Sequence, residues 1–251
     1  MTTFHPGEPT WFVNPDYRPL AGPPIAVTDP ATLATVGHIA ETTPEEMAAA
    51  LAAVGAAQKA WRRLDAKSRA KALHQVANAI EAADMRGCAE LMSREMGKPY
   101  PEAIGEIANC AGVFRYYAEM ARDEAGKVAG TTQTGSFQHV RYEPYGVSVH
   151  IMPFNFPVLL MCWTVAASLA AGNGCVVKPA PATTLSTLDF MAVFRALPAG
   201  LVACLPGGAD LAKALIASPQ THAVAFTGSV AAGRAVAAAA AAQMKPAGIE
   251  A

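Results

Sequence analysis

Hydrophobic and polar positions follow two different periods along the chain, and the change between them falls near Gly126. Before that point, from about residue 43, apolar residues recur at helical spacing, which predicts a series of amphipathic helices. The first helix begins in "TTPEEM", where Thr43 caps the helix and Pro44 fits its first position. The two glutamates that follow complement the positive end of the helix dipole. Three more helices are expected over residues 66–83, 86–96 and 100–121.

Residues 1–28 predict a different kind of structure, because prolines interrupt them repeatedly. A proline fixes its own backbone and removes a hydrogen-bond donor, so this density of prolines excludes a helix. We expect an extended strap that lies on the surface of the protein. The prolines are Pro6, Pro9, Pro15, Pro19, Pro23 and Pro24.

Beyond Gly126 the pattern becomes that of strands. Residues 126–141 carry turn signals at Gly130 and Gly135 and predict a β-hairpin. Short apolar runs then alternate with helix-length segments, the runs being "GVSVHIM", "GCVVKP", "LVACLP" and "HAVAFTG". Apolar strands joined by helical crossovers predict an α/β fold in three layers, with helices on both faces of a parallel, Rossmann-like sheet. The alanine tract "AVAAAAAAQ" is expected to be a helix packed on this sheet.

These patterns divide the chain into an extended strap over 1–28, a helical part over 29–125, the hairpin over 126–141 and the Rossmann-like part over 142–251. Composition adds that the chain is globular, since 52% of its 251 residues are hydrophobic and 16% are charged. With 19 basic and 20 acidic residues, there is no charge excess to bind nucleic acid or an anionic membrane.

The sequence also favours a cytoplasmic location. We expect no signal peptide, and the longest uncharged apolar run, residues 158–171, is too short to span a bilayer. An odd number of widely spaced cysteines, without a CxxC pair, indicates a reducing compartment and argues against disulfides. They are Cys88, Cys110, Cys162, Cys175 and Cys204.

Candidate functional residues are expected directly after each predicted strand, because open parallel sheets bind ligands at the carboxyl ends of their strands. Asn155 follows the first strand in "PFNFP", where two prolines hold the backbone. Its amide is a candidate oxyanion donor, and an Asx-type turn is the alternative interpretation. Lys178 follows the second strand in "KPAP" and is either a ligand of a cofactor hydroxyl or phosphate or an ordinary surface lysine.

Glycine-rich turns follow the third and fourth strands. Gly207 and Gly208 precede one helix, and Gly228 and Ser229 open another whose free N–H groups suit an anion. Several common motifs are incomplete: a P-loop lacks its lysine, there is no GxGxxG, and the nucleophile-elbow pattern fails at His150. An NTPase or a serine hydrolase is therefore disfavoured, and the scattered histidines lack metal-ligand spacing.

The order of "PFNFP", "KPAP", "FTGS" and "GIE" resembles the aldehyde dehydrogenase superfamily. The segments "REMGKPYPEAIGEI" and "RYEPYGV" add to this resemblance, which runs from about Thr28 to the end of the chain. It implies oxidation of an aldehyde to a carboxylic acid, with NAD or NADP as the cofactor. In the family a cysteine thiolate attacks the aldehyde, hydride passes to the nicotinamide, and water releases the acid from the thioester.

The resemblance also implies roles for particular residues. Asn155 matches the asparagine that holds the thiohemiacetal oxyanion, and Glu250 matches the glutamate that activates water. The cofactor-binding positions are Ile151, Met152, Pro153, Phe154, Lys178, Pro181, Gly208, Phe226, Gly228 and Ser229. Pro181 stands where NAD-preferring members often carry a glutamate that binds the ribose, so its presence makes NADP more permissible. No metal is implied.

Other expectations concern what this chain lacks. The family's nucleophilic cysteine lies beyond the glutamate, and none of the five cysteines matches it, so we expect no aldehyde oxidation by this chain alone. A truncated or split enzyme is one interpretation, and a non-catalytic module that binds a dinucleotide or a partner is the alternative. We expect Glu250 to lie at a frayed terminus without catalytic geometry.

Two further points concern partners and substrate. The hairpin resembles the family's oligomerisation element, which implies a homo-oligomer, either a dimer or a tetramer. Val158, Met161 and Cys162 either line an aldehyde tunnel or pack inside their helix, and packing is the favoured interpretation.

Overall fold

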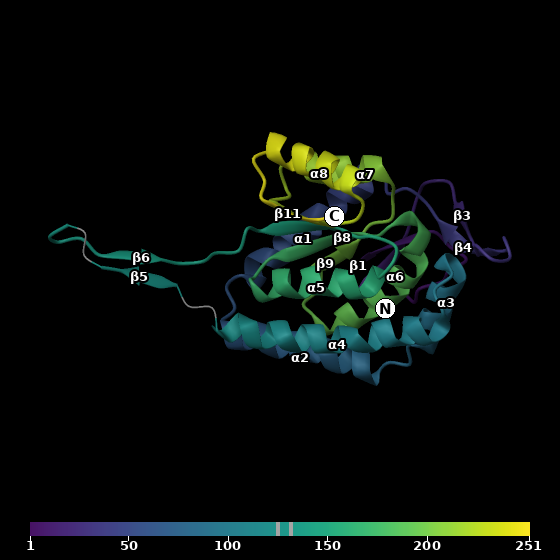
Figure 1. The fold of residues 1–251 in the computed structure, drawn as a ribbon, viewed down its shortest axis with the longest axis horizontal. Coiled ribbons are helices and arrows are strands. Elements are labelled where there is room, and N and C mark those ends of the chain that lie inside the picture. Colours follow the sequence, from purple (N-terminus) through teal and green to yellow (C-terminus); the bar gives the residue numbers. More distant parts are fainter. Residues whose placement is uncertain (124–125, 131–132) are drawn as a thin grey trace.

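The computed structural model describes residues 1–123, 126–130 and 133–251, and a mixed β-sheet lies at its centre (Figure 1). Within these residues the sheet has seven strands in the order β11-β10-β7-β8-β9-β1-β2. Its strands are β1 (Thr10–Val13), β2 (Asp16–Pro19), β7 (Val147–Ile151), β8 (Gly174–Lys178), β9 (Val202–Cys204), β10 (Ala223–Thr227) and β11 (Ala247–Glu250). Two small antiparallel pairs lie outside it: β3 (Ile25–Thr28) with β4 (Thr35–Ile39), and β5 (Lys127–Ala129) with β6 (Gln138–Val140).

Helices cover both faces of this sheet, as the sequence predicts. They are α1 (Pro44–Trp61), α2 (Ala66–Ala82), α3 (Arg86–Met96), α4 (Tyr100–Asp123), α5 (Pro157–Ala170), α6 (Thr184–Phe190), α7 (Ala209–Ala217) and α8 (Val230–Ala242), with 3-10 turns at Pro181–Thr183 and Met191–Ala196. Helices α2, α4 and α5 lie on one face, and α7 and α8 lie on the other (Figure 1). The three-layer α/β arrangement is confirmed.

The strands of the central sheet bury side chains on both faces, which explains their continuous apolar sequence. Cys175 and Val177 of β8 belong to the core shared with α2, α4 and α5. Val176, between them, belongs to the core on the opposite face, with α1, α7 and α8. A strand of period two thus supplies alternate residues to two cores.

Helix α1 begins as its sequence predicts. The Thr43 hydroxyl accepts a hydrogen bond from the Glu46 backbone N–H at 3.3 Å, and the Glu46 carboxylate accepts one from the Thr43 N–H at 2.8 Å. This reciprocal capping box satisfies two backbone donors that the helix itself leaves free, and Pro44 occupies the first turn.

The prediction of a surface strap over 1–28 is wrong for its central part. Strand β1 lies inside the sheet, pairing antiparallel with both β2 and β9, and Trp11, Phe12 and Val13 are at most 4% exposed. The segment is extended, but it is part of the core. The four residues of β1, a threonine followed by three apolar residues, are too few to carry a periodic signal, and the β9 partner lies far along the chain.

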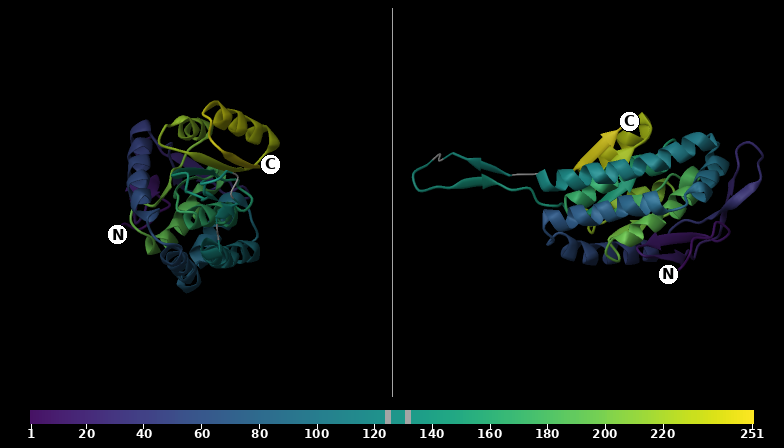
Figure 2. Two further views of the ribbon diagram at one scale, coloured as in Figure 1. Left: turned by 90° about the vertical axis from the view of Figure 1, so that its left-hand side faces the viewer. Right: turned by 90° about the horizontal axis from the view of Figure 1, so that it is seen from below.

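One predicted boundary also differs from the structure. The β3–β4 pair spans the expected boundary at residue 28, so the part predicted as helical begins with strands. The hairpin has its two strands, β5 and β6, and extends away from the body of the protein (Figure 2). The end of the helical part and the turn of the hairpin involve residues 124–125 and 131–132, which lie outside the described residues.

A buried carboxylate joins α3 to α6. The Glu95 side chain accepts hydrogen bonds from the Leu185 and Ser186 backbone N–H groups, both at 2.9 Å, and from the Ser186 hydroxyl. Burial raises the pKa of Glu95 to about 8. In either protonation state each oxygen faces a backbone N–H group that can only donate, so an amide at this position turns its NH₂ group toward one of them.

We therefore expect Glu95→Gln to lower the free energy of unfolding by about 1–3 kcal/mol, the usual cost of leaving a buried donor unsatisfied. Urea unfolding followed by circular dichroism measures this difference. Glu90→Gln, on the exposed face of the same helix, is the matched control and should change stability little. Equal stability of the two variants would contradict the capping role of Glu95.

Candidate active site

Most of the predicted site residues lie at the edge of the sheet where the parallel strands end. Phe226 of β10 pairs with Ile151 of β7, and Ile151 pairs with Lys178 of β8. The loops that follow these strands therefore leave the sheet side by side. They carry Asn155, Pro181 and Ser229, so residues distant in sequence meet along one edge.

The loop after β7 exposes the residues that the resemblance places against cofactor and substrate. Ile151 and Met152 are buried and anchor the loop in the sheet, whereas the Phe154 side chain is 59% exposed. Asn155 is exposed, and within the described chain its amide has no hydrogen-bond partner. The amide is thus free to donate to a bound molecule.

Lys178 is not a surface lysine, because it is only 5% exposed. Its ammonium donates to the backbone carbonyls of Pro179 at 2.7 Å and Gly207 at 2.9 Å, which ties the loops after β8 and β9 together. Burial lowers the pKa of Lys178 to about 8. Two of its three donors are used within the described chain, which leaves a third.

Glu41 lies at the same edge of the sheet, beside Gly208, although the sequence did not predict it as a site residue. Its carboxylate accepts a hydrogen bond from the Gly208 backbone N–H at 2.9 Å. A Cβ atom at Gly208 would come within 3.0 Å of that oxygen, so a larger residue there would shift the Glu41 side chain slightly. Nothing in the local sequence marks Glu41, which comes from the connection between β4 and α1.

The start of α8 supplies an anion-binding geometry at the same edge. Ser229 is its N-cap, and the serine hydroxyl accepts a hydrogen bond from the Ala232 N–H at 3.3 Å. Ser229 is exposed, so the first turn of the helix faces solvent. Gly228 donates its N–H to the Glu250 backbone carbonyl at 3.0 Å, and Phe226 is buried below them.

Glu250 is not at a frayed terminus, so that expectation is wrong. Strand β11 pairs in parallel with β10, and Glu250 lies opposite Thr227. The ladder holds its backbone in the sheet while its side chain remains exposed. A short "AGIE" segment after an alanine-rich helix gave no local sign of this pairing.

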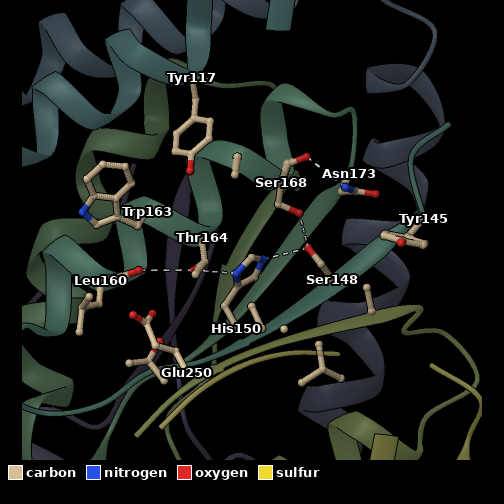
Figure 3. Close-up of a pocket in the computed structure, with 16 residues that line it drawn as sticks. Tyr117, Tyr145, Ser148, His150, Leu160, Trp163, Thr164, Ser168, Asn173 and Glu250 are labelled. Atoms are coloured by element: carbon tan, nitrogen blue, oxygen red, sulfur yellow. Dashed lines mark hydrogen bonds between the residues drawn. The ribbon is translucent and has the colours of Figure 1, made fainter. Parts of the chain in front are cut away.

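The Glu250 side chain lines a pocket of about 680 Å³ between the sheet and α5 (Figure 3). Tyr117, Leu160 and Trp163 form part of its apolar wall. The other predicted catalytic residue, Asn155, is not among the described residues that line it.

A polar network forms the floor of this pocket. The Ser148 hydroxyl lies 2.9 Å from His150 Nε2, and the Thr164 hydroxyl lies 2.9 Å from His150 Nδ1 (Figure 3). Burial lowers the pKa of His150 to about 3, so the imidazole is neutral near pH 7. Both ring nitrogens are occupied, and His150 therefore has a structural role.

None of the five cysteines lies in an exposed setting. All five are free and buried, and burial raises the pKa of Cys175 to about 12. Val158, Met161 and Cys162 are each fully buried in the core. Their burial agrees with helix packing and not with the lining of a tunnel. Among the described residues, no cluster of His, Cys, Asp or Glu is arranged to hold a metal ion, and no helix is both long and apolar enough to cross a membrane.

Comparisons with a family model and with known proteins all point to one family. Residues 18–251 match the model of the aldehyde dehydrogenase family. Retinaldehyde dehydrogenase 3 of Rattus norvegicus is 36% identical over 233 residues, which cover 90% of this chain and 45% of that protein. Betaine aldehyde dehydrogenase of Hordeum vulgare is 34% identical, covering 95% of this chain and 49% of that protein.

Solved structures agree with these sequence relatives. An NADP-dependent enzyme of E. coli superposes with a TM-score of 0.90 at 31% identity, covering 97% of this chain and 51% of that one. The NAD⁺ complex of an aldehyde dehydrogenase from Bacillus cereus has a TM-score of 0.90 at 29% identity and covers 96% of this chain and 50% of that one. The chain spans about half the length of the curated relatives it matches. On its motifs, its fold and these matches, the chain belongs to the aldehyde dehydrogenase family.

Proposed function

We propose that this chain binds NAD or NADP and, in an enzyme that contains it, serves the oxidation of an aldehyde to a carboxylic acid. The observation that carries the proposal is the alignment of Phe226, Ile151 and Lys178 on neighbouring parallel strands. It brings the Asn155 loop, the buried lysine and the start of α8 to one edge. Ligands of open α/β sheets bind outside that edge.

The residues present fit a dinucleotide. Helices α7 and α8 both begin at the carboxyl edge, and the exposed first turn of α8 suits a pyrophosphate. Lys178 would hold the adenosine ribose, and Phe154 and Pro153 would form a wall for the cofactor. When bound, the nicotinamide supplies the hydride acceptor. One structural neighbour is NADP-dependent and another was solved with NAD⁺, which supports this ligand class.

Two side chains would act on the substrate. The free, exposed amide of Asn155 would donate a hydrogen bond to the oxygen of the aldehyde as it becomes negative. The exposed carboxylate of Glu250 would take a proton from the water that releases the acid. Because all five cysteines are buried, the proposal assigns none of them the part of nucleophile.

The hairpin supports a proposed homo-oligomer. Both of its strands are exposed along their whole length, and Val128 and Phe137 are more than 70% exposed. Within the described residues β5 and β6 form a sheet of their own, and apolar side chains on such a two-stranded ribbon suit pairing with the sheet of a second copy. We also propose a cytoplasmic location, which the free thiols support.

A non-catalytic dinucleotide-binding module is the second candidate, and the buried cysteines favour it as a reading of this chain taken alone. Steady-state assays with an aldehyde and NAD or NADP distinguish the two. If each protein that contains the chain binds the dinucleotide but does not reduce it in the presence of an aldehyde, the non-catalytic module is favoured. Turnover that depends on Asn155 would favour the enzyme.

Lys178→Met should weaken dinucleotide binding about 10- to 100-fold, because a hydrogen bond from a charged donor contributes about 1.5–3 kcal/mol. Isothermal titration of the 251-residue chain with NAD and with NADP measures this directly. Lys213→Met removes an exposed lysine from α7 and serves as the control. If neither nucleotide binds the unmodified chain, the proposed function itself fails.

Dinucleotide affinity should also fall as pH rises through about 8, because Lys178 then loses its charge. The Lys178→Met variant should show no such step. The stability effect has the opposite sign: burial of this ammonium costs stability below pH 8, and the cost is relieved as pH rises from about 8 toward the ordinary lysine pKa of 10.5. Titrations at several pH values between about 6.5 and 9 would reveal the step in affinity.

A further inference from the structure

A buried ion pair lies behind the loop that carries Asn155. Glu106 of α4 and Lys98, in the connection before α4, have side chains that are 0% and 5% exposed, and the Lys98 ammonium donates to Glu106 Oε2. Neither residue belongs to the cofactor edge or to the Glu250 pocket. Burying either charge in the core costs free energy of folding unless the two are paired.

The second oxygen of Glu106 caps helix α5. Glu106 Oε1 accepts hydrogen bonds from the backbone N–H groups of Val158 at 3.0 Å and Leu159 at 3.1 Å. These donors lie in the first turn of α5, whose own N-cap, Phe156, has no side chain that could accept them. A carboxylate at this end also complements the helix dipole. The start of α5 is therefore fixed by a residue of another helix.

Lys98 contacts the other side of the same loop. Its ammonium lies 3.8 Å from the centroid of the Phe156 ring, which is the residue directly after Asn155. Lys98 thus neutralises Glu106 and holds Phe156 by a cation–π contact. Since Pro153 and Pro157 restrict the backbone at both ends, the five-residue loop "PFNFP" has little freedom left.

We propose that Glu106, with Lys98 as its counter-ion, is a positioning residue that sets where the Asn155 amide points. The Asn155 side chain has no partner of its own within the described chain, so its place is determined by the backbone that this pair holds. Displacement of a catalytic group by about 1 Å costs about 100-fold in rate. The inference rests on the proposed role of Asn155 as an oxyanion donor.

Glu106→Gln tests the contact without any catalytic assay. One end of the new amide must turn its NH₂ group toward a donor, either the Lys98 ammonium or the α5 N–H groups. Hydrogen exchange of the 251-residue chain should then be about tenfold faster or more at Val158 and Leu159, since the cap protects these amides. Glu102→Gln, exposed and one turn earlier on α4, should leave them unchanged. Unchanged protection in Glu106→Gln would overturn the proposal.

The double variant Lys98→Met, Glu106→Gln guards against a simple loss of folding. It removes both charges and leaves an amide oxygen that can still accept from α5, so it should restore protection to within about threefold. Failure of the double variant to restore protection, although it folds, would count against the capping geometry.

The catalytic readout is a split between kcat and binding. In an active enzyme containing this chain, Glu106→Gln should lower kcat by about tenfold or more while the dinucleotide Kd stays the same, and the double variant should recover most of kcat. A purely structural residue would lower stability and leave kcat unchanged at temperatures where the protein is folded, and that result would overturn the positioning role. If Asn155→Ala keeps full kcat, the proposed role of Asn155 as an oxyanion donor is wrong. The hydrogen-exchange test of the Glu106 cap does not depend on that role.

Discussion

Replacing Asn155 with alanine is expected to lower kcat by about 10²- to 10³-fold in an enzyme that contains this chain. The reason is that the aldehyde oxygen gains negative charge when the substrate is attacked, and the Asn155 amide, in the loop after β7, is an exposed donor with no partner in the described chain. The interaction strengthens in the transition state, so its loss appears in kcat rather than in substrate binding. Dinucleotide affinity should change little.

Steady-state kinetics with an aldehyde and NAD or NADP measure this effect, together with titration of the dinucleotide. Asn109→Ala removes another exposed amide, on α4, and is the matched control. A kcat within about threefold of the unmodified enzyme would contradict the role of Asn155, because one missing oxyanion donor costs much more than that.

Local signals predicted most of the regular structure. The Thr43 cap, the proline after it and the helical spacing of apolar residues depend only on neighbours within a few positions, and α1 begins where they place it. The strand ends that carry Lys178 and Ser229 were equally visible, because a parallel strand buried on both faces reads as a short apolar run before a turn. These parts of the site follow from the fold class.

Residues that act across the fold were missed, and they share one physical feature. Glu41, Glu95 and Glu106 each accept hydrogen bonds from backbone N–H groups that are 167, 90 and 52 residues away in sequence. A carboxylate that caps a distant helix or turn looks, in sequence, like any other glutamate. Burial identifies Glu95 and Glu106, and only the folded structure shows it.

Pairing partners that are distant in sequence explain the other errors. Strand β1 is part of the core because β9 lies beside it, and Glu250 is held because β10 offers a free edge to β11. Neither pairing leaves a trace in the four residues of the strand itself. The order of the loops predicted the edge of the sheet where the site lies, but not that pairing of β11 with β10 holds Glu250 in place.

In an enzyme that contains this chain, Glu250→Gln is expected to lower the steady-state rate of aldehyde oxidation by about 10²- to 10⁴-fold, the contribution typical of a general base. The amide keeps the size of the carboxylate but cannot take a proton from water. Because β11 pairs through its backbone, the substitution should leave the Thr227 pairing and the fold unchanged. In the proposed reaction hydride transfer comes before the step that needs water, so the first turnover should remain fast.

Stopped-flow measurement of cofactor reduction tests this order. Glu250→Gln should give a burst close to one reduced cofactor per active site, followed by a slow phase, while Glu45→Gln, an exposed glutamate of α1, should behave as the unmodified enzyme. Loss of the burst together with the steady-state rate would place Glu250 before hydride transfer, and an unchanged steady-state rate would remove it from catalysis. If a small base added to the solution accelerates the slow phase of Glu250→Gln, the lost function is proton removal from water. An added base can replace a general base, but it cannot replace a residue that only positions the substrate.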